Sequence, residues 1–265
     1  MSSNKGAEMK RDQAGGVAGG VAPVIDGARN DSAAVPVIGG VRNDSAAVAA
    51  PVIGLTGGIG TGKSTAAEYL LEAGLPDAPA RGLVHVDADA ISRQLTVKEP
   101  GAANPVLEEI GKAFGGAGDN TRPVLREDGS LDRGAMAALV FSDPDKKKLL
   151  EDILFRHIIA EIHRQIEAAG EAGSPVLLDA PLLFESGLDS LCDSVIVVTA
   201  DEDVRIERVM ARDGCSEDEV RARIRNQMPD EDKRARADYV VDNSGSLEEL
   251  QRRLDGVLQA IGAAR

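Results

Sequence analysis

A glycine-rich motif constrains the fold of this chain more than any other feature. Residues 57–64 read Gly-Gly-Ile-Gly-Thr-Gly-Lys-Ser and fit the pattern G-x-x-x-x-G-K-S/T. The motif follows a short apolar run at 52–55 and precedes a helix-forming segment at 63–73. A strand, a glycine loop and a helix in this order are typical of a phosphate-binding loop in a parallel α/β sheet. The alternative is a glycine-rich turn without a ligand, and the context on both sides argues against it.

Each residue type in this loop suits the binding of a nucleoside triphosphate such as ATP. Glycines let backbone N–H groups turn inward around phosphate oxygens, and the N-terminus of the next helix favours an anion. Lys63 can reach the β- and γ-phosphates, Ser64 suits a Mg²⁺ ligand, and Thr65 adds a hydroxyl near the α-phosphate. The predicted nucleotide-binding residues of the loop are Gly58, Gly60, Thr61, Gly62, Lys63, Ser64 and Thr65.

The rest of the chain alternates short apolar runs with helix-like segments. Its core must be aliphatic, because aromatic residues make up only 2% of the sequence. Unbroken apolar strands between helices indicate a parallel sheet covered on both faces, which predicts a three-layer α/β/α fold. Strands are expected at 52–55, 83–86, 176–178, 194–198 and 239–242. Helices are expected at 63–73, 88–96, 105–113, 132–141, 143–169, 201–212, 216–227 and 246–261.

The first 50 residues differ from the rest, since they are rich in Gly, Ala, Ser, Asn and Asp. Residues 22–35 and 35–48 are near copies with an offset of 13 residues. Two copies of so short a unit cannot form a solenoid. We predict that 1–50 is a disordered low-complexity extension, with a partner-binding tail as the alternative, and that 51–265 is the folded domain.

Charge and hydropathy exclude several classes of protein. The formal net charge is −14, so we expect no nucleic-acid partner, because binding nucleic acid needs a basic surface. No stretch approaches the ~18 apolar residues that span a bilayer, and no apolar segment follows Lys5, Lys10 and Arg11 as in a secretory signal. Cys192 and Cys215 have no metal-ligand spacing. We therefore expect a cytoplasmic protein with no membrane partner.

Acidic residues follow two of the predicted strands, where α/β sheets present active-site groups. Asp87 and Asp89 come after 83–86, and one could accept a hydroxyl proton while the other orients Mg²⁺ through water. Asp87 could instead cap the next helix. Asp179 follows the strand at 176–178 and could hold a metal-bound water, or it could be a helix cap or a loop carboxylate. Position alone leaves these alternatives open.

Arginines recur late in the chain at helical spacing. Arg205, Arg208 and Arg212 fall near one helix face, and the next helix carries three more. Two helices of this kind could form a lid at about 205–236 that closes over ATP and neutralises charge in the transition state. Interspersed acidic residues favour the alternative, a salt-bridged surface helix, for the arginines other than Arg208 and Arg212.

Together these motifs resemble one family, the dephospho-CoA kinases. The resemblance rests on 53–65, on Val-Asp-Ala-Asp at 86–89, on Asp-Ala-Pro-Leu-Leu-Phe-Glu at 179–185, on Glu-Arg-Val-Met-Ala-Arg-Asp at 207–213, and on Ala-Asp-Tyr-Val-Val-Asp-Asn-Ser-Gly at 237–245. They run in the family's order over about 52–260. The resemblance implies ATP-dependent phosphorylation of the ribose 3′-hydroxyl of dephospho-CoA.

By matching position, the family implies roles for particular residues. Asp89 is expected to be the catalytic carboxylate with Asp87 as its neighbour, and Asn243 falls in the adenine-side loop. Arg208 and Arg212 match the lid arginines that contact phosphates. The helices at about 90–170 resemble the acceptor-binding part, and 181–185 resembles the wall of the acceptor site. The expected cofactors are ATP and Mg²⁺, and the expected assembly is a monomer or weak homo-oligomer.

One departure from the family pattern lies in the helix at 143–169. The family usually has His-Pro where this chain has Phe155 and Arg156, and His157 comes two residues later, so no histidine role is carried over. Two alternatives to this function remain open. One is a kinase of another small metabolite. The other is a nucleotide-dependent switch protein, although the guanine-reading motif Asn-Lys-x-Asp is absent from the sequence.

Overall fold

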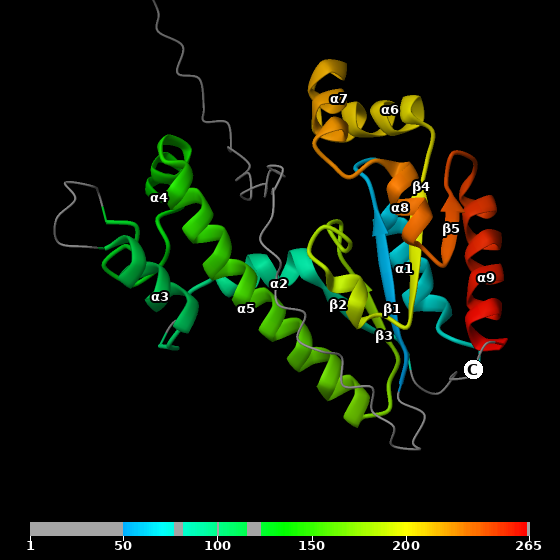
Figure 1. Ribbon diagram of the computed structural model, residues 1–265, viewed down its shortest axis with the longest axis horizontal. Coiled ribbons are helices and arrows are strands. Elements are labelled where there is room, and N and C mark those ends of the chain that lie inside the picture. Colours follow the sequence, from blue (N-terminus) through cyan, green and yellow to red (C-terminus); the bar gives the residue numbers. More distant parts are fainter. Residues whose placement is uncertain (1–49, 77–81, 100, 116–122, 264–265) are drawn as a thin grey trace, which may run out of the picture.

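The computed structural model describes residues 50–76, 82–99, 101–115 and 123–263. The predicted extension at 1–50, with its duplication, lies outside the described residues except for Ala50. The described chain forms a parallel sheet flanked by helices on both faces (Figure 1). This arrangement confirms the predicted three-layer α/β/α fold.

The sheet has five parallel strands in the order β2-β3-β1-β4-β5. Its strands are β1 (Val52–Gly57), β2 (Val84–Asp87), β3 (Val176–Asp179), β4 (Ser194–Thr199) and β5 (Tyr239–Asp242). β1 lies in the centre and is buried along its whole length. Its neighbours pair in register, with Leu55 beside Asp179 on β3 and Ile196 on β4. The glycine loop, which follows the central strand, therefore lies at the middle of the sheet's carboxyl edge.

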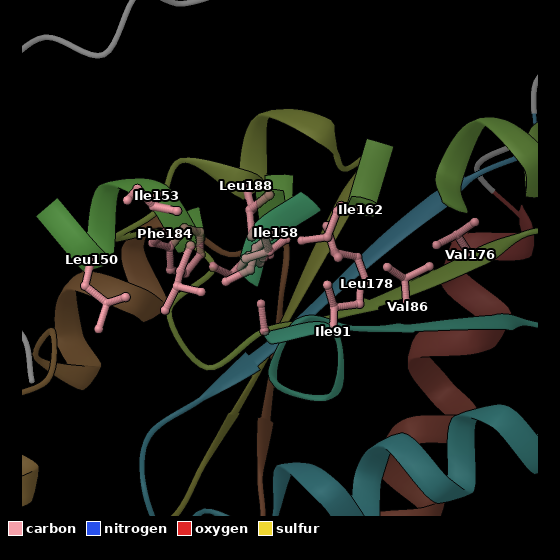
Figure 2. Close-up of a cluster of buried hydrophobic side chains, with 14 of the residues drawn as sticks. Val86, Ile91, Leu150, Ile153, Ile158, Ile162, Val176, Leu178, Phe184 and Leu188 are labelled. Atoms are coloured by element: carbon pink, nitrogen blue, oxygen red, sulfur yellow. The ribbon is translucent and has the colours of Figure 1, made fainter. Parts of the chain in front are cut away.

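Alternation along the strands divides the core into two layers. On one face, Ile53 and Leu55 pack with α1 (Lys63–Ala73) and α9 (Leu247–Ala263). On the other face, Val195 and Val197 belong to the cluster covered by the long helix α5 (Pro144–Glu171). Figure 2 shows this second cluster, in which Ile153, Ile158 and Ile162 of α5 lie near Val86, Leu178, Phe184 and Leu188. Because side chains change face at every residue, both helical layers are anchored by the same strands.

A helical part lies beyond one side of the sheet. It consists of α2 (Ala88–Leu95), α3 (Pro105–Phe114), α4 (Arg133–Ser142) and α5, and α5 contacts each of the other three (Figure 1). The sequence explains where α5 begins, because the Asp143 side chain accepts hydrogen bonds from the backbone N–H groups of Asp145 and Lys146, and Pro144 fills the first position. The predicted single long helix at 143–169 is confirmed.

The chain after β4 forms α6 (Glu202–Asp213), α7 (Glu217–Arg225) and α8 (Asp230–Arg236). α6 and α7 make a small hairpin whose apolar centre is Ile206, Val209 and Val220. A capping box between Ser216 and Glu219 begins α7. Neither α8 nor the short 3₁₀ turn Leu188–Leu191 was expected from the sequence. None of the described helices is long and apolar enough to cross a membrane.

Cys192 packs against the middle of the central strand. A Cβ atom on Gly54 would lie 2.8 Å from the Cys192 sulfur, so the thiol occupies the space that a side chain would need. Burial raises the pKa of this thiol to about 12, and nearby Asp189 adds to the effect. Cys215 lies half-buried between α6 and α7. Both thiols are therefore partly buried, Cys192 against the cluster under the sheet and Cys215 against the small α6–α7 cluster.

Candidate active site

Two side-chain hydrogen bonds fix the backbone of the glycine loop at the carboxyl end of β1, one from within the loop and one from Asn243. The Thr61 hydroxyl is fully buried and donates a 2.9 Å hydrogen bond to the carbonyl of Gly58. From the far edge of the sheet, the side-chain amide of Asn243 donates to the carbonyl of Thr61 at 2.8 Å. Gly60 and Gly62 adopt positive φ angles of 78° and 85°, which favour glycine. With Gly62 at the N-cap position, the loop leads directly into the first turn of α1.

Gly62 offers a specific test of this geometry. A Cβ atom at this position would overlap the side-chain nitrogen of Asn243, and the positive φ would strain any other residue. For Gly62→Ala we therefore expect ATP affinity to fall by about tenfold or more, because Asn243 must move and the loop must reopen. Isothermal titration with ATP measures the change. As a control, Gly256→Ala lies within α9 with open space around it, and it should bind ATP like the wild type.

Lys63 and Asp179 form an ion pair at the centre of the site. The Lys63 Nζ contacts Asp179 Oδ1, and the two side chains are only 15% and 6% exposed. His85 of β2 places its Nε2 3.5 Å from the other Asp179 oxygen. Asp179 ends β3 and pairs with Leu55, two residues before β1 ends, so it is positioned by the sheet register rather than by a helix cap. The glycine-loop lysine is thus held by the acidic group that follows the adjacent strand.

Asp87 and Asp89 lie at the end of β2, on the far side of Asp179 from the glycine loop. Asp87 pairs in register with Asp179, and its side chain accepts a 2.9 Å hydrogen bond from Ala90 N–H at the start of α2. The helix-cap alternative for Asp87 is therefore confirmed. Asp89 is exposed in the first turn of α2, yet loss of hydration is the largest influence that raises its pKa. The Lys63 charge opposes this shift, and the Asp87 charge adds to it.

The raised pKa of Asp89 leads to a prediction about pH dependence. A carboxyl group that acts as a base works only when ionised, so activity falls as pH drops through its pKa. Since the Asp87 charge raises that pKa, Asp87→Asn should move the acidic limb of the kcat/KM profile to lower pH. Asparagine still caps a helix, so thermal stability should stay close to that of the wild type. An unchanged acidic limb in this variant would assign that limb to another group.

The three arginines of α6 have three different environments. Arg208 lies beside the loop, and its Nη1 is enclosed without a hydrogen-bond partner in the described chain. That atom is 3.8 Å from where a Cβ of Gly62 would be. Arg212 is 63% exposed and forms a two-pronged pair with Asp213, at 2.7 and 3.0 Å. The structure therefore brings Arg208, but not Arg212, to the glycine loop.

Arg205 corrects an expectation from the sequence. The sequence favours an exposed position for Arg205 on a salt-bridged surface helix, but in the structure the residue is only 4% exposed. Its Nε donates to the Ile59 carbonyl at 2.8 Å and its Nη1 pairs with Asp230 at 2.8 Å. Gln227 was missed as well, although its side-chain oxygen accepts a 2.8 Å hydrogen bond from Ile59 N–H. Both residues act on the loop backbone, which the sequence motif does not encode.

A pocket of about 200 Å³ opens beside the loop. Residues from the start of α1, from α6, from the segment after β5 and from the start of α9 line it. Its lining comprises Gly62, Thr65, Arg208, Asn243, Gly245, Leu247 and Leu250. The mixture of one cation, one amide and two leucines suits a planar base joined to phosphates. Thus Thr65 and Asn243, which the sequence placed in the nucleotide set, lie in the same pocket.

The described residues contain no cluster of three or more His, Cys, Asp or Glu side chains that could hold a metal by itself. Mg²⁺ usually binds through substrate phosphates, waters and only one or two protein groups. Ser64 is exposed at the first turn of α1, and Asp179 ends the adjacent strand β3. The donor set is therefore suitable for a metal that arrives with the nucleotide.

Comparison with known proteins decides the family. The family model for dephospho-CoA kinase (CoaE) matches residues 51–249, which is most of the chain. The chain belongs to the dephospho-CoA kinase family. A curated dephospho-CoA kinase of Anaeromyxobacter dehalogenans is 43% identical over 81% of this chain and 93% of that protein. One of Corynebacterium diphtheriae is 44% identical over 76% of this chain and 92% of that protein.

Solved structures agree with this assignment. A protein of Thermus thermophilus superposes with a TM-score of 0.62 and 37% identity, covering 80% of this chain and 98% of the other. The dephospho-CoA kinase of Campylobacter jejuni superposes with a TM-score of 0.60 and 25% identity over the same shares. As a member of the family, the chain is a kinase with ATP as its phosphate donor.

The departure from the dephospho-CoA kinase pattern also has a structural counterpart. Arg156 and His157 of α5 both contact Glu109 of α3, at 2.6 and 2.7 Å. These contacts hold the pKa of the Glu109 carboxyl below its ordinary value, with the His157 hydrogen bond as the larger cause. Phe155 points outward and is 37% exposed. The segment thus joins two helices of the helical part through one carboxylate.

Proposed function

We propose that this chain transfers the γ-phosphoryl group of ATP to the ribose 3′-hydroxyl of dephospho-CoA, giving CoA and ADP. The acceptor oxygen attacks the γ-phosphorus while the bond to the β,γ-bridging oxygen breaks, and the hydroxyl proton leaves to a carboxylate. Asp89 is the proposed proton acceptor, with Asp87 beside it. Lys63 and Arg208 stabilise charge on the transferred group.

The observation that carries this proposal is the row of charged groups at one edge of the sheet. β2, β3 and β1 are neighbours and end in or lead to Asp87–Asp89, Asp179 and the loop before Lys63. Within this row the pKa of Asp89 is raised, the Lys63 charge acts on Asp89, and Lys63 itself pairs with Asp179 between them. An acceptor hydroxyl held near Asp89 would therefore approach a γ-phosphate held near Lys63, with Asp179 between the two residues.

Several parts of the proposal concern binding rather than chemistry. The nucleotide would occupy Gly58, Gly60, Thr61, Gly62, Lys63, Ser64, Thr65 and Asn243, with Arg212 turning inward from Asp213. Ser64, and Asp179 through water, would hold Mg²⁺, which neutralises phosphate charge when bound. The helices at about 90–170 and the segment 181–185 would hold the acceptor, and 205–236 would form the lid. We also propose a cytoplasmic enzyme that works as a monomer or weak homo-oligomer.

Incubation with MgATP and dephospho-CoA tests the activity directly. We expect CoA and ADP to form in equal amounts with the full chain. A version that begins at Pro51 should behave in the same way, because the matched region begins there. Adenosine, shikimate and gluconate serve as alternative acceptors. Efficient phosphorylation of one of them, with none of dephospho-CoA, would replace this function by that of another small-metabolite kinase.

A further inference from the structure

One short segment contacts both the glycine loop and the segment 181–185, the two regions proposed to bind ATP and the acceptor. This segment, residues 227–233, connects α7 to α8 and includes the first turn of α8, and we call it the bridge segment. At one end it touches the glycine loop, and at the other it touches the segment 181–185. Figure 1 shows α8 below the α6–α7 hairpin, and α8 packs against β4. The roles of these bridge residues are not explained by the phosphoryl-transfer chemistry above.

At the glycine loop, the bridge segment fixes the backbone of one residue from both sides. Ile59 N–H donates to the Gln227 side chain at 2.8 Å, and the Ile59 carbonyl accepts from Arg205 at 2.8 Å. Arg205 is in turn paired with Asp230 of the bridge segment at 2.8 Å. Gly58 leaves room for both partners, since a Cβ there would lie 2.5 Å from an Arg205 nitrogen. The loop tip is therefore held in one position.

At the acceptor side, the contact is a buried lysine. Lys233 is 1% exposed, donates to the Pro181 carbonyl at 3.3 Å and pairs with Glu185 at 3.2 Å. Glu185 also accepts from Met228 N–H at 3.3 Å. The same Pro181 carbonyl accepts from the Thr56 hydroxyl of β1 at 3.1 Å. Two bridge residues and the central strand thus converge on the first and last residues of 181–185.

A buried lysine is costly unless its partners stay in place, because its charge has left water. Lys233 therefore stays in position only while Pro181 and Glu185 remain where they are. Movement of the loop tip at Ile59 must displace Gln227 or the Arg205–Asp230 pair. That displacement strains the five residues between Gln227 and Lys233 or breaks the lysine contacts. The arrangement gives the two segments a shared mechanical constraint.

We propose that Gln227 and Lys233 are positioning residues that couple the ATP-binding loop to the acceptor segment. In the described structure their side chains contact Ile59, Pro181 and Glu185, none of which is proposed to act on the transferred phosphoryl group. Through the bridge segment, the loop position that accepts ATP also sets the position of 181–185, so each substrate binds more tightly when the other site is formed. This inference rests on the proposed function for the identity of the acceptor. Its test is therefore designed so that failure of either claim can be recognised separately.

The test uses Gln227→Met, Lys233→Met and the double variant in the full chain. ATP affinity is measured by calorimetry without acceptor, and KM for dephospho-CoA is measured at saturating ATP. Coupling predicts effects across the bridge: Lys233→Met should weaken ATP binding about fivefold, and Gln227→Met should raise acceptor KM by a similar factor. The double variant should be no worse than the worse single variant, because one broken contact already uncouples the sites.

The control is Arg252→Gln, which removes one exposed charge on α9, outside the bridge segment and the proposed lid, and should match the wild type in both measurements. The proposal is overturned if Gln227→Met changes only the ATP affinity and Lys233→Met changes only the acceptor KM. The double variant would then show both changes at their full single-variant size. Should Lys233→Met fail to fold, the acceptor KM of Gln227→Met decides alone. A wild-type protein that forms no CoA refutes the proposed function, and ATP affinity of Lys233→Met then still decides the coupling.

Discussion

Replacing Asp89 with asparagine should lower kcat by about 10²- to 10⁴-fold, the usual contribution of a positioned general base. Asparagine has nearly the same shape but cannot accept the hydroxyl proton. ATP affinity should change little, because the hydrogen bonds that hold the glycine loop in the described structure come from Gly58, Thr61, Arg205, Gln227 and Asn243, not from Asp89. Single-turnover phosphorylation of dephospho-CoA gives the chemical rate, and calorimetry gives the affinity. The acidic limb of the pH profile should disappear together with the rate.

Asp203→Asn is a matched control for this prediction. Like Asp89, Asp203 lies in the first turn of a helix, so both replacements remove a negative charge from a helix N-terminus. Asp203 is 96% exposed and lies outside the row of charged groups. It should keep wild-type turnover. Near-normal kcat in Asp89→Asn would move the base role to another group, with Asp87 as the first candidate.

Replacing Lys63 with methionine should lower kcat by about 10²- to 10³-fold, as for removal of one preorganised group that stabilises transition-state charge. ATP should also bind more weakly, because the proposed role of the lysine includes contact with the phosphates in the ground state as well. The variant leaves Asp179 without its ion-pair partner at 6% exposure, which should cost about 1–3 kcal/mol of stability. Thermal unfolding and steady-state kinetics together measure both effects.

A double variant separates these two consequences. Lys63→Met with Asp179→Asn removes both charges of the buried pair, so much of the lost stability should return. Turnover should not return, because the positive charge of Lys63 that would stabilise the transferred phosphoryl group is still missing. If the double variant regained activity, Lys63 would act by neutralising Asp179 rather than by contacting the nucleotide. Wild-type stability in Lys63→Met alone would show that the ion pair contributes little to folding.

The sequence was sufficient for the parts of the molecule that depend on local chemistry. The glycine loop, the strands that flank it and the long helix α5 follow from spacing, apolar runs and a capping aspartate with proline. Asp87 and Asp179 could be placed at strand ends for the same reason. Their detailed partners could not, because the register between β2, β3 and β1 joins residues far apart in the chain.

The bridge segment shows what sequence reasoning could not reach. Helix α8 reads Asp-Glu-Asp-Lys-Arg-Ala-Arg, which has no apolar periodicity to predict a helix. Lys233 and Arg205 are charged residues in charged surroundings, so exposure was the natural expectation, yet both are buried. Their burial depends on carbonyl and carboxylate groups supplied by distant segments. No single stretch of sequence contains that information.

The contrast between the two thiols has a practical consequence for observing the lid. At neutral pH, a thiol with a pKa of about 12 is almost entirely protonated, so Cys192 should resist alkylating dyes. Cys215 lies in the connection between α6 and α7, the part proposed to move when ATP binds. The sequence contains no other cysteine. The native chain therefore carries one convenient attachment point for a fluorescent reporter, and opening and closing could be followed without engineering a new label site.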